Sequence, residues 1–350
     1  MEIDFLCEDG SPLGCSVKTL MGDDPAQVGV GGSEYAMLTL CEEWTKQGHR
    51  VRLYNDPRAD WSSPFEQLPK GAFNPDEDRD ILIVFRSPNL RVVGAKGLKI
   101  WFSCDQQTIG DFRAFRPMVD KVVCISQFHS DHFRTTYGIG DAIVIDLPVR
   151  VSEYENKDIE KVKDRFIFTS VPARGLDIFL PWWNSIKKEI PEASLVITSD
   201  YRLWGISCGM GNEQFIKQSF GMSDITFLSA VPRPRLVEEQ LKAEINLYPC
   251  TYDELFCVAT AESQVAGVYP ITSEFGALRT TNMGTIIRID PRDGRARKQY
   301  VDETVLFRNR LREEGYDLEL QKKAVERFSP DNILKQWEEK IFNGKDLLVE

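Results

Sequence analysis

Two glutamates eight residues apart, Glu254 and Glu262, lie in a stretch whose residue types suit the binding of an anionic ligand. The apolar run 245–248 predicts a buried strand, the polar residues 249–253 a turn, and residues 255–266 a short helix. A helix that begins at the carboxyl edge of a sheet directs free backbone N–H groups and its positive dipole end at that edge. The stretch therefore predicts a site for a phosphate-bearing ligand.

The spacing of these glutamates distinguishes a proton-sharing carboxylate pair from two separate ligand contacts. Eight helical residues at about 1.5 Å each span roughly 12 Å, which is too far for two carboxylates that share one proton. The same span suits two anchors at opposite ends of an extended nucleotide-sugar. Most of the helix around Glu262 is apolar, so its carboxylate needs a partner, and ribose hydroxyls would serve. The structural alternative is a half-buried helix with one capping acid and one solvated acid.

The residues that frame the pair resemble the donor-binding signature of family-4 retaining glycosyltransferases. Tyr-Pro precedes the glutamates, and Ala-Gly, a Pro-Ile-Thr strand and Gly-Ala-Leu (residues 276–278) follow them. In that family the first glutamate lies beside the donor sugar and the second binds the nucleotide ribose. The resemblance implies these roles for Glu254 and Glu262, with Leu255 and Phe256 as further donor-binding residues.

A glycine-rich segment, residues 28–34, precedes a predicted amphipathic helix. We expect Ser33 to be the N-cap of this helix and Gly48 to end it. A strand over residues 51–54 follows. The apolar face of the helix carries Met37, Leu40, Cys41 and Trp44.

The glycine-rich segment departs twice from a dinucleotide-binding fingerprint. Glu34 stands where the third glycine belongs, and the segment does not directly follow the first predicted strand. The segment resembles instead the amino-terminal domain of the same glycosyltransferase family. That resemblance implies that Gly31, Gly32 and Ser33 face the donor phosphates. The structural alternative is a tight turn that needs positive φ angles.

Arg174, which Gly175 follows, resembles the cationic segment of the family. Such a cation neutralises the donor diphosphate while negative charge develops on the leaving nucleotide. Thr169 or Ser170 occupies the position of an additional arginine in the family, which leaves the implied clamp one cation short, and Ser170 is a candidate donor-binding residue. The arginines that could replace the missing charge are Arg202, Arg233 and Arg235.

Asp105 matches the aspartate of a His-Asp pair that family members often carry, with Cys104 at the histidine position. The resemblance therefore implies that Asp105 contacts the acceptor or the donor sugar. Together with Glu254 and Arg174, it completes the set of candidate catalytic residues.

Two patterns are formally compatible with a metal ion. A D-x-D sequence, residues 76–78, lies in a Pro-rich polar run, residues 60–80, that predicts a surface loop, and His129 and His132 stand three residues apart. Neither pattern has a neighbouring group that would fix the geometry of a metal site. We therefore expect no metal and no cofactor.

The totals of the chain exclude some classes of protein. It has 350 residues, a net charge of −11 and 42% hydrophobic residues, which suggests two ordinary domains and argues against a dedicated nucleic-acid surface. No signal peptide or membrane-spanning run is present in the sequence, so we expect a cytoplasmic protein, with peripheral membrane contact still open. The eight cysteines form no C-x-x-C pair and are expected to be free, buried thiols.

Strands and helices alternate along both halves, which predicts parallel sheets covered by helices. The expected organisation is two facing Rossmann-like domains (GT-B) with the active site in the cleft between them. The expected boundaries are 1–150 for the acceptor-side domain, 151–164 for a linker, 165–325 for the donor domain and 326–350 for a helix that packs back on the first domain. The apolar stripe of that helix consists of Ile333, Trp337 and Ile341.

The sequence thus predicts a retaining glycosyltransferase. We expect it to move a hexose-type sugar from a UDP- or GDP-linked donor to a hydroxyl of a glycan or glycoconjugate acceptor without a metal. Two alternatives remain open: a nucleotide-sugar epimerase or hydrolase on the same fold, and a catalytically idle sugar-binding protein.

Overall fold

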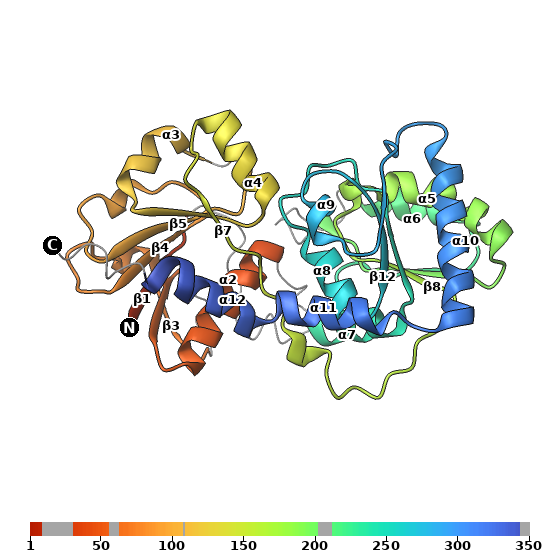
Figure 1. Ribbon diagram of the computed structural model, residues 1–350, viewed down its shortest axis with the longest axis horizontal. Helices are drawn as coiled ribbons and strands as arrows, with labels where there is room; N and C mark the ends of the chain where they lie inside the picture. The colour runs from red at the N-terminus through yellow and green to blue at the C-terminus, as the bar shows by residue number, and fades with distance from the viewer. Residues whose placement is uncertain (9–30, 56–62, 108, 202–211, 344–350) are drawn as a thin grey trace. The chain divides into compact units, whose positions relative to one another are not determined.

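The computed structural model divides the chain into two compact units (Figure 1). Among the described residues, the first unit contains 1–148 and 328–343, and the second contains 149–327. The division after Pro148 lies close to the expected domain boundary at residue 150. The structure describes all residues except 9–30, 56–62, 108, 202–211 and 344–350.

The first unit is built on a parallel sheet with the strand order β3-β2-β1-β4-β5-β6-β7. The chain adds β2 and β3 on one side of β1 and the later strands on the other, so the direction of winding changes between β1 and β4. Ligands bind such sheets at the carboxyl ends of the strands, beside this switch point. The strands are β1 Glu2–Leu6, β2 Arg50–Tyr54, β3 Glu66–Leu68, β4 Ile81–Phe85, β5 Leu98–Phe102, β6 Lys121–Cys124 and β7 Ile143–Val144.

Helices cover both faces of this sheet (Figure 1). Helix α2 (Gly32–Lys46) lies on one face, and α3 (Phe112–Phe115) and α4 (Gln127–His132) lie on the other. Helix α12 (Pro330–Trp337) runs beside α2 and brings Trp337 within 5.4 Å of Trp44, ring centre to ring centre. The single-turn helices are η1 Lys70–Ala72, η2 Leu90–Val92 and η3 Arg116–Met118, and π-helical turns follow α4 (Phe133–Tyr137) and α12 (Glu338–Phe342).

The second unit repeats this architecture with the strand order β10-β9-β8-β11-β12-β13, again entirely parallel. The switch point lies between β8 and β11. The strands are β8 Arg165–Phe168, β9 Ser194–Ile197, β10 Ile225–Phe227, β11 Ile245–Tyr248, β12 Tyr269–Ser273 and β13 Thr285–Ile287.

Helices flank the second sheet on both faces, with α7 and α8 on one side and α5, α6 and α10 on the other (Figure 1). The predicted fold class, two parallel α/β units, is confirmed. The helices and helical turns are η5 Val151–Glu153, η6 Pro172–Arg174, α5 Leu176–Glu189, α6 Asn212–Ser219, α7 Arg233–Lys242, α8 Val258–Val265, α9 Leu278–Thr281, α10 Ala296–Glu314 and α11 Leu318–Phe328.

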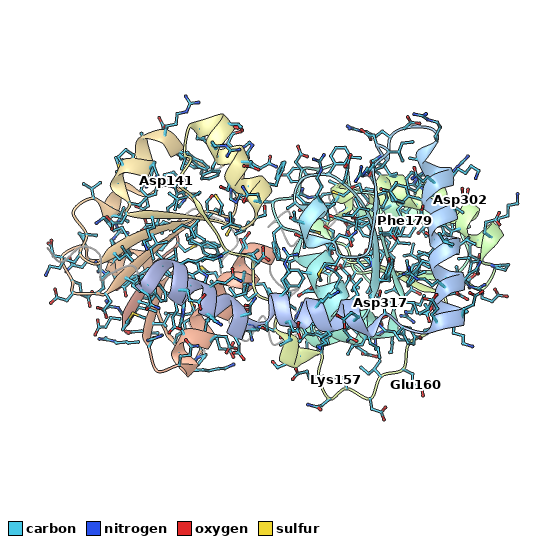
Figure 2. All side chains as sticks on the ribbon, in the orientation of Figure 1. Asp141, Lys157, Glu160, Phe179, Asp302 and Asp317 are labelled. Atoms are coloured by element: carbon cyan, nitrogen blue, oxygen red, sulfur yellow. The ribbon has the colours of Figure 1, made fainter. Side chains whose placement is uncertain are left out.

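The aromatic side chains of α5, Phe179, Trp182 and Trp183, are buried in the core of the second unit, and Figure 2 shows Phe179 in its interior. The residues expected to form a linker behave differently along their length. Lys157 and Glu160 are exposed and project from a long loop in Figure 2, whereas Tyr154 and Asp164 are buried. The end residues of this segment therefore belong to the fold of the second unit.

Three predicted boundaries are wrong. The run 60–80 is not a loop throughout, because its part Glu66–Leu68 forms the edge strand β3, whose polar residues give no apolar signal. Ser33 is not an N-cap, since α2 begins at Gly32 after Gly31. The helix predicted over 255–266 begins only at Val258, because Cys257 adopts a left-handed backbone with φ 74°.

Candidate active site

Arg174 and Glu254 meet at the carboxyl edge of the second sheet. Arg174 ends the turn after β8, and Glu254 lies in the loop after β11, the neighbouring strand. The Nη1 atom of Arg174 lies 3.9 Å from Oε1 of Glu254, and the two side chains are only 15% and 13% exposed. The sequence-predicted cation and acid are therefore brought together beside the switch point of the sheet.

Tyr248 at the end of β11 fixes the carboxylate of Glu254. Its hydroxyl donates to Oε1 of Glu254 at 2.7 Å and lies 3.0 Å from Oγ of Ser170. A phenol has one proton to donate, so Ser170 acts as the donor to Tyr248. Burial raises the pKa of Tyr248 above its ordinary value, which keeps the phenol protonated as a donor. Ser170 thus acts on Glu254 through Tyr248.

Two glycines permit the close approach of the loops that carry this site. Gly175 has φ 111°, and a Cβ atom there would lie 2.6 Å from the carbonyl oxygen of Pro249. Gly276 has φ 57°, and a Cβ atom there would lie 2.5 Å from the backbone nitrogen of Glu254. The backbone N–H of Ala277 donates to the carbonyl of Glu254 at 2.6 Å. These two glycines therefore allow the loops around Glu254 to pack closely.

The guanidinium of Arg174 stacks on the ring of Tyr252, with 3.2 Å from Cζ to the ring centre. Burial lowers the pKa of Arg174, but the nearby Glu254 and Tyr248 outweigh that effect, and the pKa is raised overall. Arg174 is thus a fixed positive charge at the sheet edge, suited to a phosphate or a developing anion.

Glu262 lies on α8, separate from this pair, and is buried. Its Oε1 atom lies 2.5 Å from Nη1 of Arg233, and Gln240 donates to its Oε2 atom at 3.3 Å. Burial raises the pKa of Glu262, and the charge of Arg233 opposes this shift. The predicted need for a partner is correct, but the partner present in the structure is a protein cation.

The three arginines considered as a replacement for the missing cation are placed differently. Arg233 also contacts Glu153 at 2.7 Å, so its charge is engaged in a buried ionic cluster at the start of α7. Arg235 pairs with Glu238 at 3.1 Å on its own helix. Arg202 lies outside the described residues.

Leu255 and Phe256 lie in the turn that precedes α8, and both are buried. Their apolar side chains leave only backbone groups for a polar ligand. Because α8 begins at Val258, Glu254 lies in a loop and not in the first turn of the helix. The distance of roughly 12 Å expected for eight helical residues therefore does not apply to the two glutamates.

In the first unit, Gly31, Gly32 and Ser33 lie at the start of α2, next to Glu34. The Nη2 atom of Arg86 lies 2.5 Å from Oε1 of Glu34. Its Nε atom lies 3.2 Å from Oδ2 of Asp105. Arg86 follows β4 with a left-handed backbone, φ 64°, and connects the start of α2 to the loop after β5.

His129 holds the backbone of Asp105. The N–H of Ile125 donates to Nδ1 of His129 at 3.3 Å, so Nε2 carries the proton that it donates to the Asp105 carbonyl at 3.2 Å. Burial lowers the pKa of His129 to about 3, so the ring stays neutral. Both ring nitrogens are engaged with the backbone, which removes His129 from the possible metal ligands.

Sequence reasoning missed Tyr248, Arg86 and His129 as supporting residues. A polar residue at the end of a predicted central strand is the signal that would have found Tyr248 and Arg86. His129 gave no comparable signal, because its role depends on a backbone carbonyl 24 residues away. Within the described part of the chain, no group of three or more His, Cys, Asp or Glu side chains is placed to hold a metal ion.

The described residues contain six cysteines and no membrane-spanning helix. None of the helices described is long and apolar enough to cross a membrane. Cys15 and Cys208 lie outside the described residues. The cysteines Cys7, Cys41, Cys104, Cys124, Cys250 and Cys257 are buried thiols that form no disulfide among the described residues, as predicted.

Solved glycosyltransferase structures share this fold. A glycosyltransferase of avilamycin A biosynthesis aligns over 97% of this chain and 96% of its own, with a TM-score of 0.68 and 15% identity. Sucrose-phosphate synthase from Thermosynechococcus elongatus aligns over 99% and 100%, with a TM-score of 0.68 and 12% identity. HepE of Anabaena, solved with UDP-glucose, aligns over 98% and 100%, with a TM-score of 0.64 and 12% identity. No family model and no curated protein sequence matches this chain.

The fold is that of the GT-B glycosyltransferases. Identities of this size establish the fold and not the reaction, which has to be argued from the residues at the sheet edges.

Proposed function

We propose that this protein is a retaining glycosyltransferase that moves a hexose-type sugar from a nucleoside diphosphate-sugar to an acceptor hydroxyl. The observation that carries the proposal is the Arg174–Glu254 pair at the carboxyl edge of a GT-B sheet. A fixed cation beside a carboxylate held by Tyr248 is suited to a substrate that combines a diphosphate with a sugar.

In the proposed reaction, Arg174 stabilises the diphosphate as the glycosidic bond breaks and negative charge develops on the leaving nucleotide. Glu254 accepts hydrogen bonds from the donor sugar hydroxyls and orients the ring. We place the ribose at Glu262, where Arg233 and Gln240 already orient the carboxylate. Asp105, held by Arg86 and His129, is proposed to contact the acceptor or the donor sugar.

Retention fits the composition of this site. A double-displacement mechanism needs a carboxylate nucleophile and a second carboxylic acid about 5–5.5 Å away. At the edge that carries Glu254, the close charged partner is a guanidinium. We therefore propose departure of the nucleotide and attack of the acceptor on the same face of the sugar, through an ion-pair-like state stabilised by Arg174.

The donor base is tested by thermal shift with UDP, GDP, ADP and dTDP. A ligand that binds only the folded state raises the melting temperature, and a concentration of 100 Kd stabilises by about 2.7 kcal/mol. UDP comes first in the panel because HepE was solved with UDP and with UDP-glucose. Stabilisation by none of the four would contradict the proposal.

Metal independence is part of the proposal, because Arg174 supplies the positive charge that a divalent ion supplies elsewhere. Transfer measured after dialysis against EDTA should equal transfer in the presence of added Mg²⁺ or Mn²⁺. A loss of transfer that either ion restores would show that a metal takes part.

A further inference from the structure

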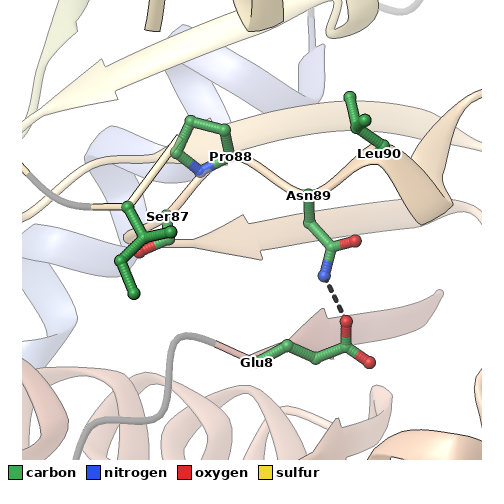
Figure 3. Close-up of a pocket in the computed structure, with 6 residues that line it drawn as sticks. Glu8, Ser87, Pro88, Asn89 and Leu90 are labelled. Carbon is green, nitrogen blue, oxygen red and sulfur yellow. Dashed lines mark hydrogen bonds between the residues drawn. The ribbon is translucent and has the colours of Figure 1, made fainter. Parts of the chain in front are cut away.

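A cavity of about 210 Å³ opens at the switch point of the first sheet (Figure 3). Glu8 follows β1, and Ser87, Pro88, Asn89 and Leu90 follow β4. These are the two strands between which the direction of winding changes. The volume lies below the about 300–1,000 Å³ of ordinary small-molecule sites, so one ring-sized group fits and a whole nucleotide does not.

The floor of the cavity is polar and only partly satisfied. Asn89 donates to Oε2 of Glu8 at 2.6 Å, as Figure 3 shows, and Nη1 of Arg91 pairs with Oε1. A carboxylate accepts about four hydrogen bonds, so Glu8 keeps capacity for a ligand. The Oγ atom of Ser87 is buried, in a residue that is 8% exposed, and has no hydrogen-bond partner among the described residues. A buried hydroxyl without a hydrogen bond costs free energy, and a ligand that bonds to it would remove this cost.

The charges of the described lining residues disfavour an ionic ligand. Arg91 already compensates Glu8 and also donates to the carbonyls of Lys70 and Phe73, both at 2.8 Å, so its guanidinium is committed to the fold. Among the described lining residues, an anion would meet the carboxylate of Glu8 without a spare cation, and a cation would meet a carboxylate that is already paired. The matching ligand is neutral and rich in hydrogen-bond donors.

The remaining lining residues are apolar. Pro88, Leu90 and Ile109 line the cavity, and Leu90 and Ile109 are 68% and 79% exposed. The loop that carries Ile109 packs closely on Pro88, because a Cβ atom on Gly110 would lie 3.0 Å from it. A carboxylate and a hydroxyl beside exposed apolar side chains match a sugar ring, whose hydroxyls donate and whose C–H face packs on apolar groups.

We infer that this cavity, with Ser87 and Glu8 as its polar contacts, is a subsite for a neutral sugar unit of the acceptor. The inference rests on the proposed function, because only a glycosyltransferase has an acceptor. It adds that the acceptor carries a neutral sugar unit. It assigns to Ser87 and Glu8 the recognition of ring hydroxyls and to Pro88 and Ile109 the apolar contact.

Saturation-transfer NMR on the full-length protein tests the subsite without any nucleotide. The probes are methyl α-D-glucopyranoside, methyl α-D-mannopyranoside and methyl β-D-galactopyranoside, with methyl α-D-glucuronide as the anionic comparison. At least one neutral glycoside should bind, and more tightly than the glucuronide. Loss of one hydrogen bond in Ser87→Ala or Glu8→Gln should weaken that binding about tenfold.

Matched controls are Ser130→Ala on α4 and Glu66→Gln on β3, in the same unit but outside the cavity lining. Binding that is unchanged in both cavity variants, or absent for all three neutral glycosides, overturns the inference. Glycoside binding that depends on Ser87 without any nucleotide binding would refute the transferase proposal and leave the sugar site standing. Nucleotide binding without glycoside binding would overturn the sugar subsite and leave the transferase proposal standing.

Discussion

At the scale of single residues, Arg174 and Glu254 carry the proposed chemistry. We expect Glu254→Gln and Arg174→Met each to lower the rate of sugar transfer by about two orders of magnitude, the usual cost of losing one preorganised charge at the reacting centre. Tyr248→Phe should lower it about tenfold, because Glu254 loses one hydrogen bond and keeps its charge.

The measurement is kcat for transfer from the donor identified by thermal shift. Glu274→Gln is the control for general damage, since Glu274 lies on the same unit and pairs with Arg279 at 3.6 Å. Unchanged rates in both Glu254→Gln and Arg174→Met would refute the assignment of the site. An idle sugar-binding protein would show no turnover in any form, including the natural one.

A second residue-scale prediction concerns Glu262 and Arg233. Glu262→Gln should weaken nucleotide binding with a smaller effect on kcat, as expected for a ribose contact. Arg233→Met should instead lower the free energy of unfolding by about 3–5 kcal/mol, because it leaves Glu262 buried without its cation. Titration calorimetry with the nucleoside diphosphate and urea unfolding separate the two effects. Equal nucleotide affinity in Glu262→Gln and the natural protein would remove Glu262 from the site.

At the scale of elements, the start of α8 depends on a strained residue. Cys257 has φ 74°, a conformation that costs non-glycine residues about 1–2 kcal/mol. We therefore expect Cys257→Gly to be more stable than Cys257→Ala by about 1 kcal/mol, because only glycine relieves the strain. Cys124 in β6 is the matched control, and its glycine variant should be the less stable one. Urea unfolding of the four variants gives their free energies of unfolding. If the glycine and alanine variants have the same order of stability at both positions, Cys257 is not strained.

The segment before β8 ties two helix ends together through Lys161. Its ammonium group donates to the carbonyls of Ala243 at 2.7 Å and Ala266 at 2.8 Å, the C-caps of α7 and α8. Burial lowers its pKa from 10.5 to about 7. The unfolded chain therefore binds more protons than the folded chain between these values, and stability rises with pH across that window.

The variant Lys161→Met removes this dependence. We expect the natural protein to gain about 2 kcal/mol relative to Lys161→Met between pH 7 and pH 9, measured as the difference in the free energy of unfolding. Lys163→Met, at an exposed position two residues away, should show no such change. A difference between the natural protein and Lys161→Met that is constant with pH would show that burial does not disfavour the charge.

The sequence predicted the ends of those strands and helices that have a clear apolar pattern. Strand β11 has the predicted ends, because its apolar residues form one continuous run. Strand β3 and the start of α8 were missed, because polar edge pairing and a single left-handed residue leave no such pattern. The resemblance implied roles at the donor for both Arg174 and Glu254, and their contact is seen only in the structure. The Arg233–Glu262 pair joins residues of two helices that no local pattern relates.

At the scale of the whole molecule, each unit has its own core, and α12 at the end of the chain belongs to the first. Trp337 is buried against Trp44 and Phe102 of that unit, and Trp183 is buried in the second. Replacing a buried tryptophan with alanine costs about 3–5 kcal/mol. We expect Trp337→Ala to lower the melting temperature of the first unit and Trp183→Ala that of the second.

Differential scanning calorimetry with and without the nucleoside diphosphate assigns the transitions, because the proposed donor site belongs to the second unit. The ligand should raise the melting temperature of the transition that Trp183→Ala lowers. It should leave unchanged the melting temperature of the transition that Trp337→Ala lowers. Ligand-induced stabilisation of the transition sensitive to Trp337 alone would place the nucleotide on the first sheet. The phosphates would then lie near the glycines at the start of α2, and Arg174 would lose the role argued for it.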